Sequence, residues 1–272
     1  MKFIENIINR QPLLSSLALV TLCISLMALV KIADGLSPMM MEISITVVRF
    51  LISFALLAML LKLGAGKEAL ITTPFKLWGK RWYLALLPIS IIVLMNALGV
   101  EFASLDFSAS KVTLWVFSNI GIGFVEEMMM RGAVFYILYK AWGSSQKGVY
   151  AAVLVQALIF GLAHYSNLRD MSFIDVTFMV VNATLIGIGF AGLMLVTRTI
   201  WLPVVLHSIF DMIARMNELL VPGFENVKST PLEQQIISVI IVFLFVALPG
   251  LLYTRKAMPI RESRSGHPMI SD

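Results

Sequence analysis

The feature that most limits what this chain can fold into is a series of long apolar runs. A helix needs about 20 consecutive, mostly apolar residues to cross the hydrocarbon core of a bilayer. Stretches close to or above that length lie at about 13–31, 43–61, 83–100, 112–139, 148–165, 172–197, 199–217 and 234–253. The sequence therefore predicts an all-α membrane protein, a polytopic bundle of about eight transmembrane helices.

The composition agrees with a chain that lives in lipid. Only 14% of the 272 residues are charged and 59% are hydrophobic, whereas a soluble domain carries about 25% charged residues. No soluble domain fits between the apolar runs. We therefore predict one polytopic membrane domain over residues 1–272, with a basic, disordered tail from about residue 255, and the lipid bilayer as its constant partner.

The distribution of charge predicts the topology. Lys and Arg gather near both ends of the chain and in alternate loops, chiefly in the segments 1–12, 62–82, 140–147 and 255–272. Cytoplasmic loops carry this excess in membrane proteins, so we expect both termini in the cytoplasm. Because topology explains the net charge of +5, we expect no nucleic-acid partner.

Once the charged residues at the span ends, Lys31, Asp175 and Arg215, are assigned to the loops, six ionisable side chains besides Arg49 remain inside the predicted spans. Each costs at least a few kcal/mol at such depth and by default marks function. They are Glu126, Glu127, Arg131, His164, His207 and Asp211. Arg49 is a seventh, but it lies close enough to a span end to reach the interface, and we assign it a structural role.

The spacing of these residues predicts a shared polar cavity. Glu127 and Arg131 are four residues apart, as are His207 and Asp211, and residues at this spacing lie on one face of a helix. His164 adds a polar group from a third span. Three helices thus present polar patches that can meet in the interior of the bundle.

The two adjacent glutamates cannot have the same role, because neighbouring residues on a helix diverge by about 100°. Glu127 has Arg131 to neutralise it. Glu126 has Met130 four residues on and no basic neighbour on its own helix, so burial favours its protonated form. A carboxyl group poised between its two forms suits a general base or acid. We predict Glu126 as the reactive group and Glu127–Arg131 as its support.

The same residues allow several chemistries. Glu126 and His164 could activate a water molecule while His207 and Asp211 stabilise an oxyanion. Alternatively, Glu126, His164 and His207 could bind a zinc ion whose water attacks. The H-E-x-x-H pattern is absent, so a metal site would have to be assembled between helices. We expect no cofactor and leave zinc as the open alternative. A proton-coupled transporter or a non-catalytic scaffold could also use these groups.

One match to a nucleotide-binding pattern is dismissed. GIGFAG at 187–192 fits G-x-G-x-x-G, but it lies inside an apolar helix rather than after a strand. Its small residues, Gly187, Ala191 and Gly192, more plausibly let neighbouring helices approach closely.

The ordered motifs resemble a known family. Glu126-Glu127-x-x-x-Arg131, then Phe160-x-x-x-His164, then His207-x-x-x-Asp211 are similar to the CPBP (CAAX protease and bacteriocin-processing, or Abi) intramembrane proteases, which include CAAX prenyl endopeptidases of the Ras-converting type. The motif-bearing core covers about residues 110–215. The resemblance implies an intramembrane endopeptidase in which Glu126 and His164 activate water. His207 and residue 211 would stabilise the oxyanion, with Glu127 and Arg131 holding the site.

Asp211 departs from the family, which commonly has Asn at this position. An amide donates a hydrogen bond to an oxyanion, whereas an ionised carboxylate cannot. Asp211 must therefore be protonated, orient His207 or help to hold a metal, and metal dependence stays open. The implied substrate is a peptide or a membrane-associated protein, prenylated or not. Bacterial-type relatives are linked to bacteriocin processing and self-immunity, and we expect a bacterial inner (plasma) membrane protein.

Overall fold

A computed structural model describes residues 10–31, 35–222 and 230–257 of this protein. Within those ranges the chain forms helices joined by turns, and no strand occurs. The predicted all-α class is therefore confirmed. The expected tail beyond residue 257 lies outside the described residues, as do residues 223–229 between the last two predicted spans.

The helices before the motif region are α2 (Pro12–Lys31), α3 (Pro38–Lys62) and α4 (Leu87–Ala97). Those of the motif region are α5 (Ala109–Glu127), the π-helical segment η4 (Met128–Phe135), α6 (Tyr136–Trp142), α7 (Gln146–Ala163), the 3-10 turn η5 (His164–Arg169), α8 (Phe173–Thr197) and α9 (Trp201–Ala214). The short α10 (Met216–Leu220), α11 (Leu232–Val242), the π-helical η6 (Phe243–Ala247) and α12 (Leu248–Arg255) complete the bundle. Short 3-10 turns lie at Phe75–Leu77, Trp82–Leu86 and Phe102–Ser104.

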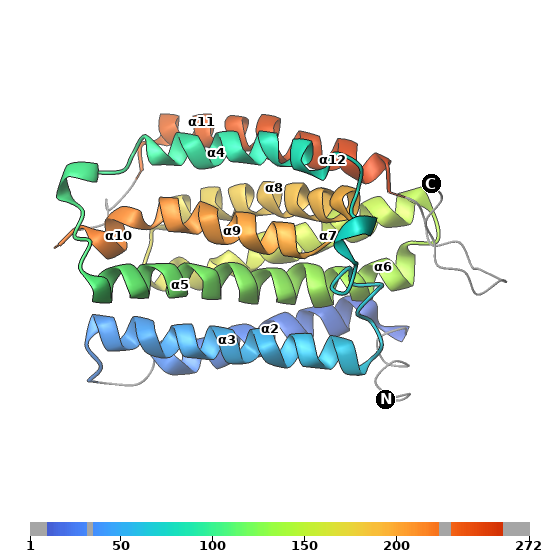
Figure 1. The fold of residues 1–272 in the computed structure, drawn as a ribbon, viewed down its shortest axis with the longest axis horizontal. Helices are drawn as coiled ribbons and strands as arrows, with labels where there is room; N and C mark the ends of the chain where they lie inside the picture. Colours follow the sequence, from blue (N-terminus) through green and yellow to red (C-terminus); the bar gives the residue numbers. More distant parts are fainter. Residues whose placement is uncertain (1–9, 32–34, 223–229, 258–272) are drawn as a thin grey trace.

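The helices run side by side in a bundle, with α2 and α3 along one side and α4, α11 and α12 along the other (Figure 1). The helices α5, α7, α8 and α9 of the motif region lie between these two layers. The start of α2 and the end of α12 lie at the same end of the bundle. This arrangement places the predicted site residues in the middle layer, enclosed on both sides.

The predicted membrane spans are confirmed in part. Five segments are long and apolar enough to cross a membrane: Pro12–Val30, Pro38–Lys62, Gln146–Arg169, Phe173–Thr197 and Leu232–Arg255. Trp82–Ala97 and Trp201–Ala214 are apolar but shorter. The remaining predicted span, 112–139, is the continuous helix formed by α5, η4 and α6, which carries the charged motif. The predicted count of about eight is therefore not established by length and composition alone.

Local sequence explains several helix ends. Ser37, Ser145 and Ser172 each precede a helix and accept a hydrogen bond from a backbone N–H of its first turn, which satisfies a donor that the helix leaves free. Arg198 adopts a left-handed backbone conformation (φ 61°) directly after α8. This conformation stops the helix and turns the chain into α9.

Large apolar side chains cover the outside of the bundle. Leu51, Phe54, Leu94 and Leu98, for example, have exposed fractions of 63%, 57%, 69% and 87%. A soluble monomer rarely exposes contiguous apolar surface on this scale, whereas a bilayer solvates it. The apolar exterior and the candidate spans together indicate an integral membrane protein.

Glycines bring α8 unusually close to its neighbours, as the small residues of 187–192 predicted. A Cβ atom on Gly187 would lie 2.9 Å from Ala157 of α7, and one on Gly192 would lie 2.1 Å from the backbone oxygen of Gly250 in α12. Such separations leave no room for a side chain, so α8 packs backbone to backbone between α7 and α12.

Candidate active site

The first motif lies where one long helix changes its winding. Glu126 and Glu127 end α5, and Arg131 lies in the π-helical segment η4. Every residue of η4 is buried. The change in winding coincides with the charged motif. π-helical turns are rare and occur frequently at functional sites.

Glu127 joins the first motif to the third. Its Oε1 atom lies 3.0 Å from Nη1 of Arg131 and 2.7 Å from Nδ1 of His207 on α9. The side chains of Glu127 and Arg131 are fully buried, and that of His207 is 7% exposed. The predicted Glu127–Arg131 pair is therefore present. The carboxylate also holds the imidazole of His207, a contact between helices that the spacing did not predict.

Arg131 lies between two aromatic rings. Its guanidinium carbon is 4.8 Å from the ring centre of Phe160 on α7 and 5.4 Å from that of Phe190 on α8. The contact with Glu127 is close enough for an ion pair but is not aligned as a hydrogen bond, and none of the three guanidinium nitrogens has a hydrogen-bond partner among the described residues. The buried charge is therefore balanced by one carboxylate and by two ring faces.

His207 faces acidic groups through both of its ring nitrogens. While Nδ1 contacts Glu127, Nε2 lies 3.5 Å from Oε2 of Glu126 and 3.6 Å from Oδ2 of Asp211. A carboxylate only accepts hydrogen bonds, so the geometry favours N–H groups on both nitrogens. With Arg131 and a charged His207 against three carboxyl groups, the cluster is neutral when one carboxyl group keeps its proton.

His164 lies at the edge of this cluster. Its Nδ1 donates a hydrogen bond to the backbone oxygen of Phe160 at 2.9 Å, which leaves Nε2 available, and its ring meets that of Phe160 edge-on at 5.0 Å. The Phe160 ring in turn lies 6.3 Å from that of His207. No hydrogen bond or ion pair joins His164 to Glu126 within the described chain. Of the three predicted polar patches, two meet directly, and the third is connected through Phe160.

Glu126 is the most open of the acidic groups. Its side chain is 26% exposed, compared with 14% for Asp211 and none for Glu127. An incoming water molecule or substrate would therefore reach Glu126 first. One oxygen of Asp211, by contrast, is buried without a hydrogen-bond partner in the described structure.

The donor set expected for zinc does not come together. Among the residues that the structure describes, no group of three or more His, Cys, Asp or Glu side chains is arranged to hold a metal ion. Glu126, His164 and His207 are therefore not arranged as the ligands of one ion in the described structure.

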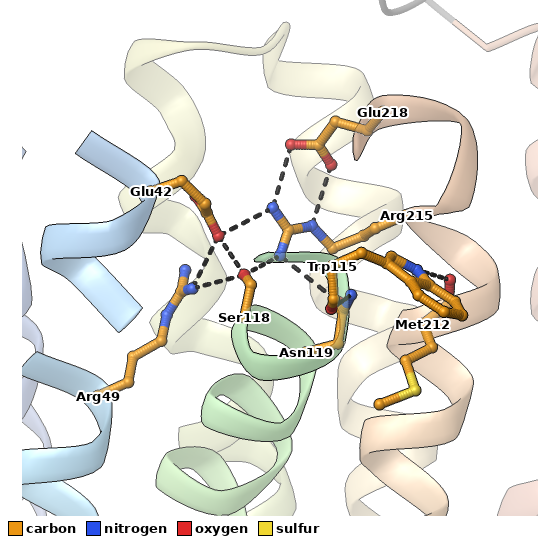
Figure 2. A network of polar contacts seen from close by, with 8 residues as sticks. All are labelled: Glu42, Arg49, Trp115, Ser118, Asn119, Met212, Arg215 and Glu218. Atoms are coloured by element: carbon orange, nitrogen blue, oxygen red, sulfur yellow. Dashed lines mark hydrogen bonds and ion pairs between the residues drawn. The ribbon is translucent and has the colours of Figure 1, made fainter. Parts of the chain in front are cut away.

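A second polar network lies toward the end of the bundle where α3 and α5 begin (Figure 2). Glu42 of α3 is its centre: Oε1 contacts Nη1 of Arg49 at 3.0 Å and Nη2 of Arg215 at 3.4 Å, and it accepts a hydrogen bond from the Ser118 hydroxyl. Arg215 also contacts Glu218 at 3.0 Å. The network ties α3 to α5 and to the end of α9, and the structural role expected for Arg49 has a concrete form in it.

Sequence reasoning missed Glu42, Arg215 and Phe190. Arg215 follows His207 and Asp211 at the same four-residue spacing, so the signal was present, but the residue was assigned to a loop. Phe190 gave no signal, since nothing distinguishes one Phe among many in an apolar helix.

A cavity lies apart from the charged cluster. Its volume is about 550 Å³, and it lies between the first halves of α3 and α5. Its lining is almost entirely apolar and includes Met39, Val47, Phe50 and Phe117. None of the six predicted site residues lines it.

The fold and the cluster together define a class of protein. A helical bundle with an apolar exterior encloses Glu, Arg, His and Asp side chains from three helices, which is the arrangement of a polytopic membrane protein with ionisable groups in its interior. Residues 108–213 match the family described as type II CAAX prenyl endopeptidase Rce1-like, which confirms the resemblance identified from the three ordered motifs. The match includes all six predicted site residues.

The similarity is confined to this region. It begins at the start of α5, ends within α9, and does not include α2, α3, α4, α11 or α12. Comparison with curated proteins and with solved structures gave no match.

Proposed function

We propose that this protein is an intramembrane endopeptidase of the CAAX protease type, and that it hydrolyses a peptide bond with water activated by Glu126. The observation that carries the proposal is the placement of His207, whose Nδ1 is 2.7 Å from Glu127 and whose Nε2 is 3.5 Å from Glu126. A fixed proton donor and a partly open carboxylate thus lie side by side within the family's motif region.

Glu126 acts as the general base. Its carboxylate removes a proton from water, and the oxygen attacks the carbonyl carbon of the scissile bond. The same proton is then delivered to the leaving nitrogen as the C–N bond breaks, so that the products are a carboxylate and an amine. His164 assists by accepting a hydrogen bond from the water at its free Nε2, the role that the family resemblance gives it.

His207 stabilises the oxyanion. Glu127 contacts Nδ1 and holds the ring, so the N–H of Nε2 is directed to the side on which Glu126 lies. A donor fixed before reaction stabilises developing negative charge without reorganising during the step, and loss of one such donor typically costs about 10²–10³ in kcat.

Asp211 carries the proton that neutralises the cluster. A carboxyl oxygen buried without a hydrogen-bond partner is more stable as part of a protonated acid than as an anion. A protonated Asp211 can donate a hydrogen bond to the oxyanion, as the Asn of the family does. The exchange of Asn for Asp therefore keeps the function of the position.

The proton-coupled transporter and the scaffold remain the alternatives drawn from the same residues, and the family match does not favour them. As substrate we propose the C-terminal region of a peptide or membrane-associated protein. We also propose that the protein lies in a bacterial inner membrane with both termini in the cytoplasm, on the basis of the Lys and Arg distribution.

Glu126→Gln tests the proposal. The protein is reconstituted in lipid nanodiscs and given two fluorogenic peptides of the same sequence ending in a CAAX motif, one prenylated and one not. We expect cleavage of at least one peptide, and a loss of about 10²–10⁴-fold in the variant. Glu233→Gln, on the exposed surface of α11, is the matched control and should cleave normally. A folded Glu126→Gln protein that cleaves at the wild-type rate would refute the mechanism.

A further inference from the structure

We propose that Phe190 is a positioning residue of the active site, and that the close glycine packing of α8 serves to hold its ring against Arg131 and His207. The inference rests on the proposed function for its catalytic consequence, although the contacts themselves are independent of it. Phe190 lies in the run GIGFAG and outside the three motifs that carry the predicted site residues.

The Phe190 ring contacts two members of the charged cluster. Its centre is 5.4 Å from the guanidinium carbon of Arg131 and 5.4 Å from the ring centre of His207, which it meets at 64°. The residue is only 2% exposed. One side chain therefore fixes the distance between the cation that neutralises Glu127 and the imidazole that Glu127 holds.

Arg131 depends on its aromatic neighbours more than an arginine with a full set of partners would. It is fully buried, has one ion pair, and has no hydrogen bond from its guanidinium nitrogens among the described residues. A desolvated cation gains considerably from an aromatic face. The guanidinium contacts the rings of Phe160 and Phe190. If either ring is lost, only the other ring and the Glu127 carboxylate still contact the cation.

The backbone of α8 gives Phe190 little freedom to move. A Cβ atom on Gly189 would lie 2.2 Å from Val246, and one on Gly192 would lie 2.1 Å from the backbone oxygen of Gly250. These two glycines flank Phe190 and lock α8 against η6 and α12. The run GIGFAG, which is not a nucleotide loop, thus has a specific effect: it sets the depth at which the ring reaches the cluster.

The ring face, rather than apolar bulk, is what the contact requires. Leu would fill much of the space but offers no negative face to a guanidinium and no edge-to-face contact to an imidazole. A Phe with fluorine atoms on the ring keeps the shape while its face loses negative potential. Comparing the fluorinated ring with native Phe therefore distinguishes an effect of the ring's electrostatic potential from an effect of its size and shape.

The first experiment compares wild-type protein with Phe190→Leu and with 3,4,5-trifluorophenylalanine incorporated at position 190. We expect thermal unfolding at a lower temperature for both. Fluorination should have a smaller effect when Arg131 is replaced by Met, because the coupling between Phe190 and Arg131 is then absent and only the contact with His207 remains. On the peptides described above, we expect kcat to fall about tenfold for Phe190→Leu and about threefold on fluorination, with KM changed less than about twofold.

The second experiment measures the NMR signals of the His207 ring nitrogens in the absence of substrate. The chain has three histidines, so ¹⁵N-histidine spectra can be assigned by comparison with His207→Gln. We expect the His207 signals to shift in Phe190→Leu. Leu193→Ala is the control: it leaves a comparable gap in the same helix, at a fully buried position, and should lower the unfolding temperature without moving these signals.

Three results would overturn the inference: unfolding that fluorination leaves unchanged, an equal effect of fluorination in the Arg131→Met background, or His207 signals that stay in place in Phe190→Leu. These results are distinct from failure of the proposed function. If wild-type protein cleaves neither peptide, the endopeptidase assignment fails, while unfolding and ¹⁵N spectra still decide whether Phe190 positions Arg131 and His207.

Discussion

Glu127→Gln separates the structural role of Glu127 from its catalytic role. In the native protein a single carboxylate oxygen contacts both Arg131, at 3.0 Å, and His207, at 2.7 Å. Glutamine has nearly the same shape, so the substitution removes charge with little change in packing. Arg131 then keeps its positive charge in a fully buried position with no carboxylate in contact.

The expected cost follows from that burial. Removing one partner of a buried ion pair costs about 3–5 kcal/mol, because the other charge is left uncompensated. Both side chains are 0% exposed, so screening by solvent does not reduce this figure as it does at a surface. A loss of this size is a large part of the stability of a typical domain.

A second substitution should restore stability without restoring activity. In Glu127→Gln/Arg131→Met the unpaired cation is gone, and the flexible Met side chain can pack between the rings of Phe160 and Phe190. Replacement of a buried ion pair by well-packed neutral residues is often neutral or stabilising. His207, however, still lacks the carboxylate at Nδ1, so the oxyanion donor stays poorly held.

The measurements are unfolding in a denaturing detergent titration and peptide cleavage in nanodiscs. We expect the single variant to lose about 3–5 kcal/mol, the double variant to regain most of it, and both to cleave at least about 10²-fold more slowly. A single variant as stable as wild type would show that the pair does not neutralise Arg131. Normal cleavage by the double variant would show that His207 does not need Glu127.

Three further predictions follow from the geometry. Asp211→Asn should keep cleavage within about tenfold of wild type, since an amide also donates to an oxyanion, whereas Asp211→Leu should lose about 10²-fold; equal loss in both would contradict a protonated Asp211. Gly192→Leu should prevent stable folding, because a Cβ there would lie 2.1 Å from the Gly250 oxygen; normal unfolding behaviour would show that α12 yields instead. Glu42→Gln should cost about 1–3 kcal/mol, since hydrogen bonds to Arg49 and Ser118 lose their charged acceptor; the same unfolding titration measures it, and an effect no larger than that of Glu233→Gln would mean that the network contributes nothing.

Much of the fold could be predicted because lipid imposes simple length and polarity rules. Apolar runs predicted the helical class, and each predicted span lies on a helix. These rules were less successful for two helices. The helix that bears Glu126 and Arg131 is not among the segments that are long and apolar enough to be candidate spans. The helix Trp201–Ala214 is shorter than the span predicted there. Arg198, in a left-handed conformation, delays the start of that helix.

The residues of the candidate site could be predicted from the sequence, but most of the contacts between them could not. Four-residue spacing identified Glu127 with Arg131 because both lie on one helix. The contact of Glu127 with His207 joins residues on different helices, and no spacing rule reports how two helices face each other. The contribution of Phe190 was invisible for the same reason. A buried ring matters here only because Arg131 lies beside it.

The π-helical segment Met128–Phe135 makes chain length, and not only residue type, a constraint on this protein. Each π turn spans about one residue more than an α turn, so η4 offsets the face of α5 that meets α3 and α9 from the face of α6 that meets α2 and α7. Deleting one residue would swing one end by about 100° relative to the other. The segment should therefore tolerate exchanges of one apolar residue for another far better than a gap or an insertion of a single residue.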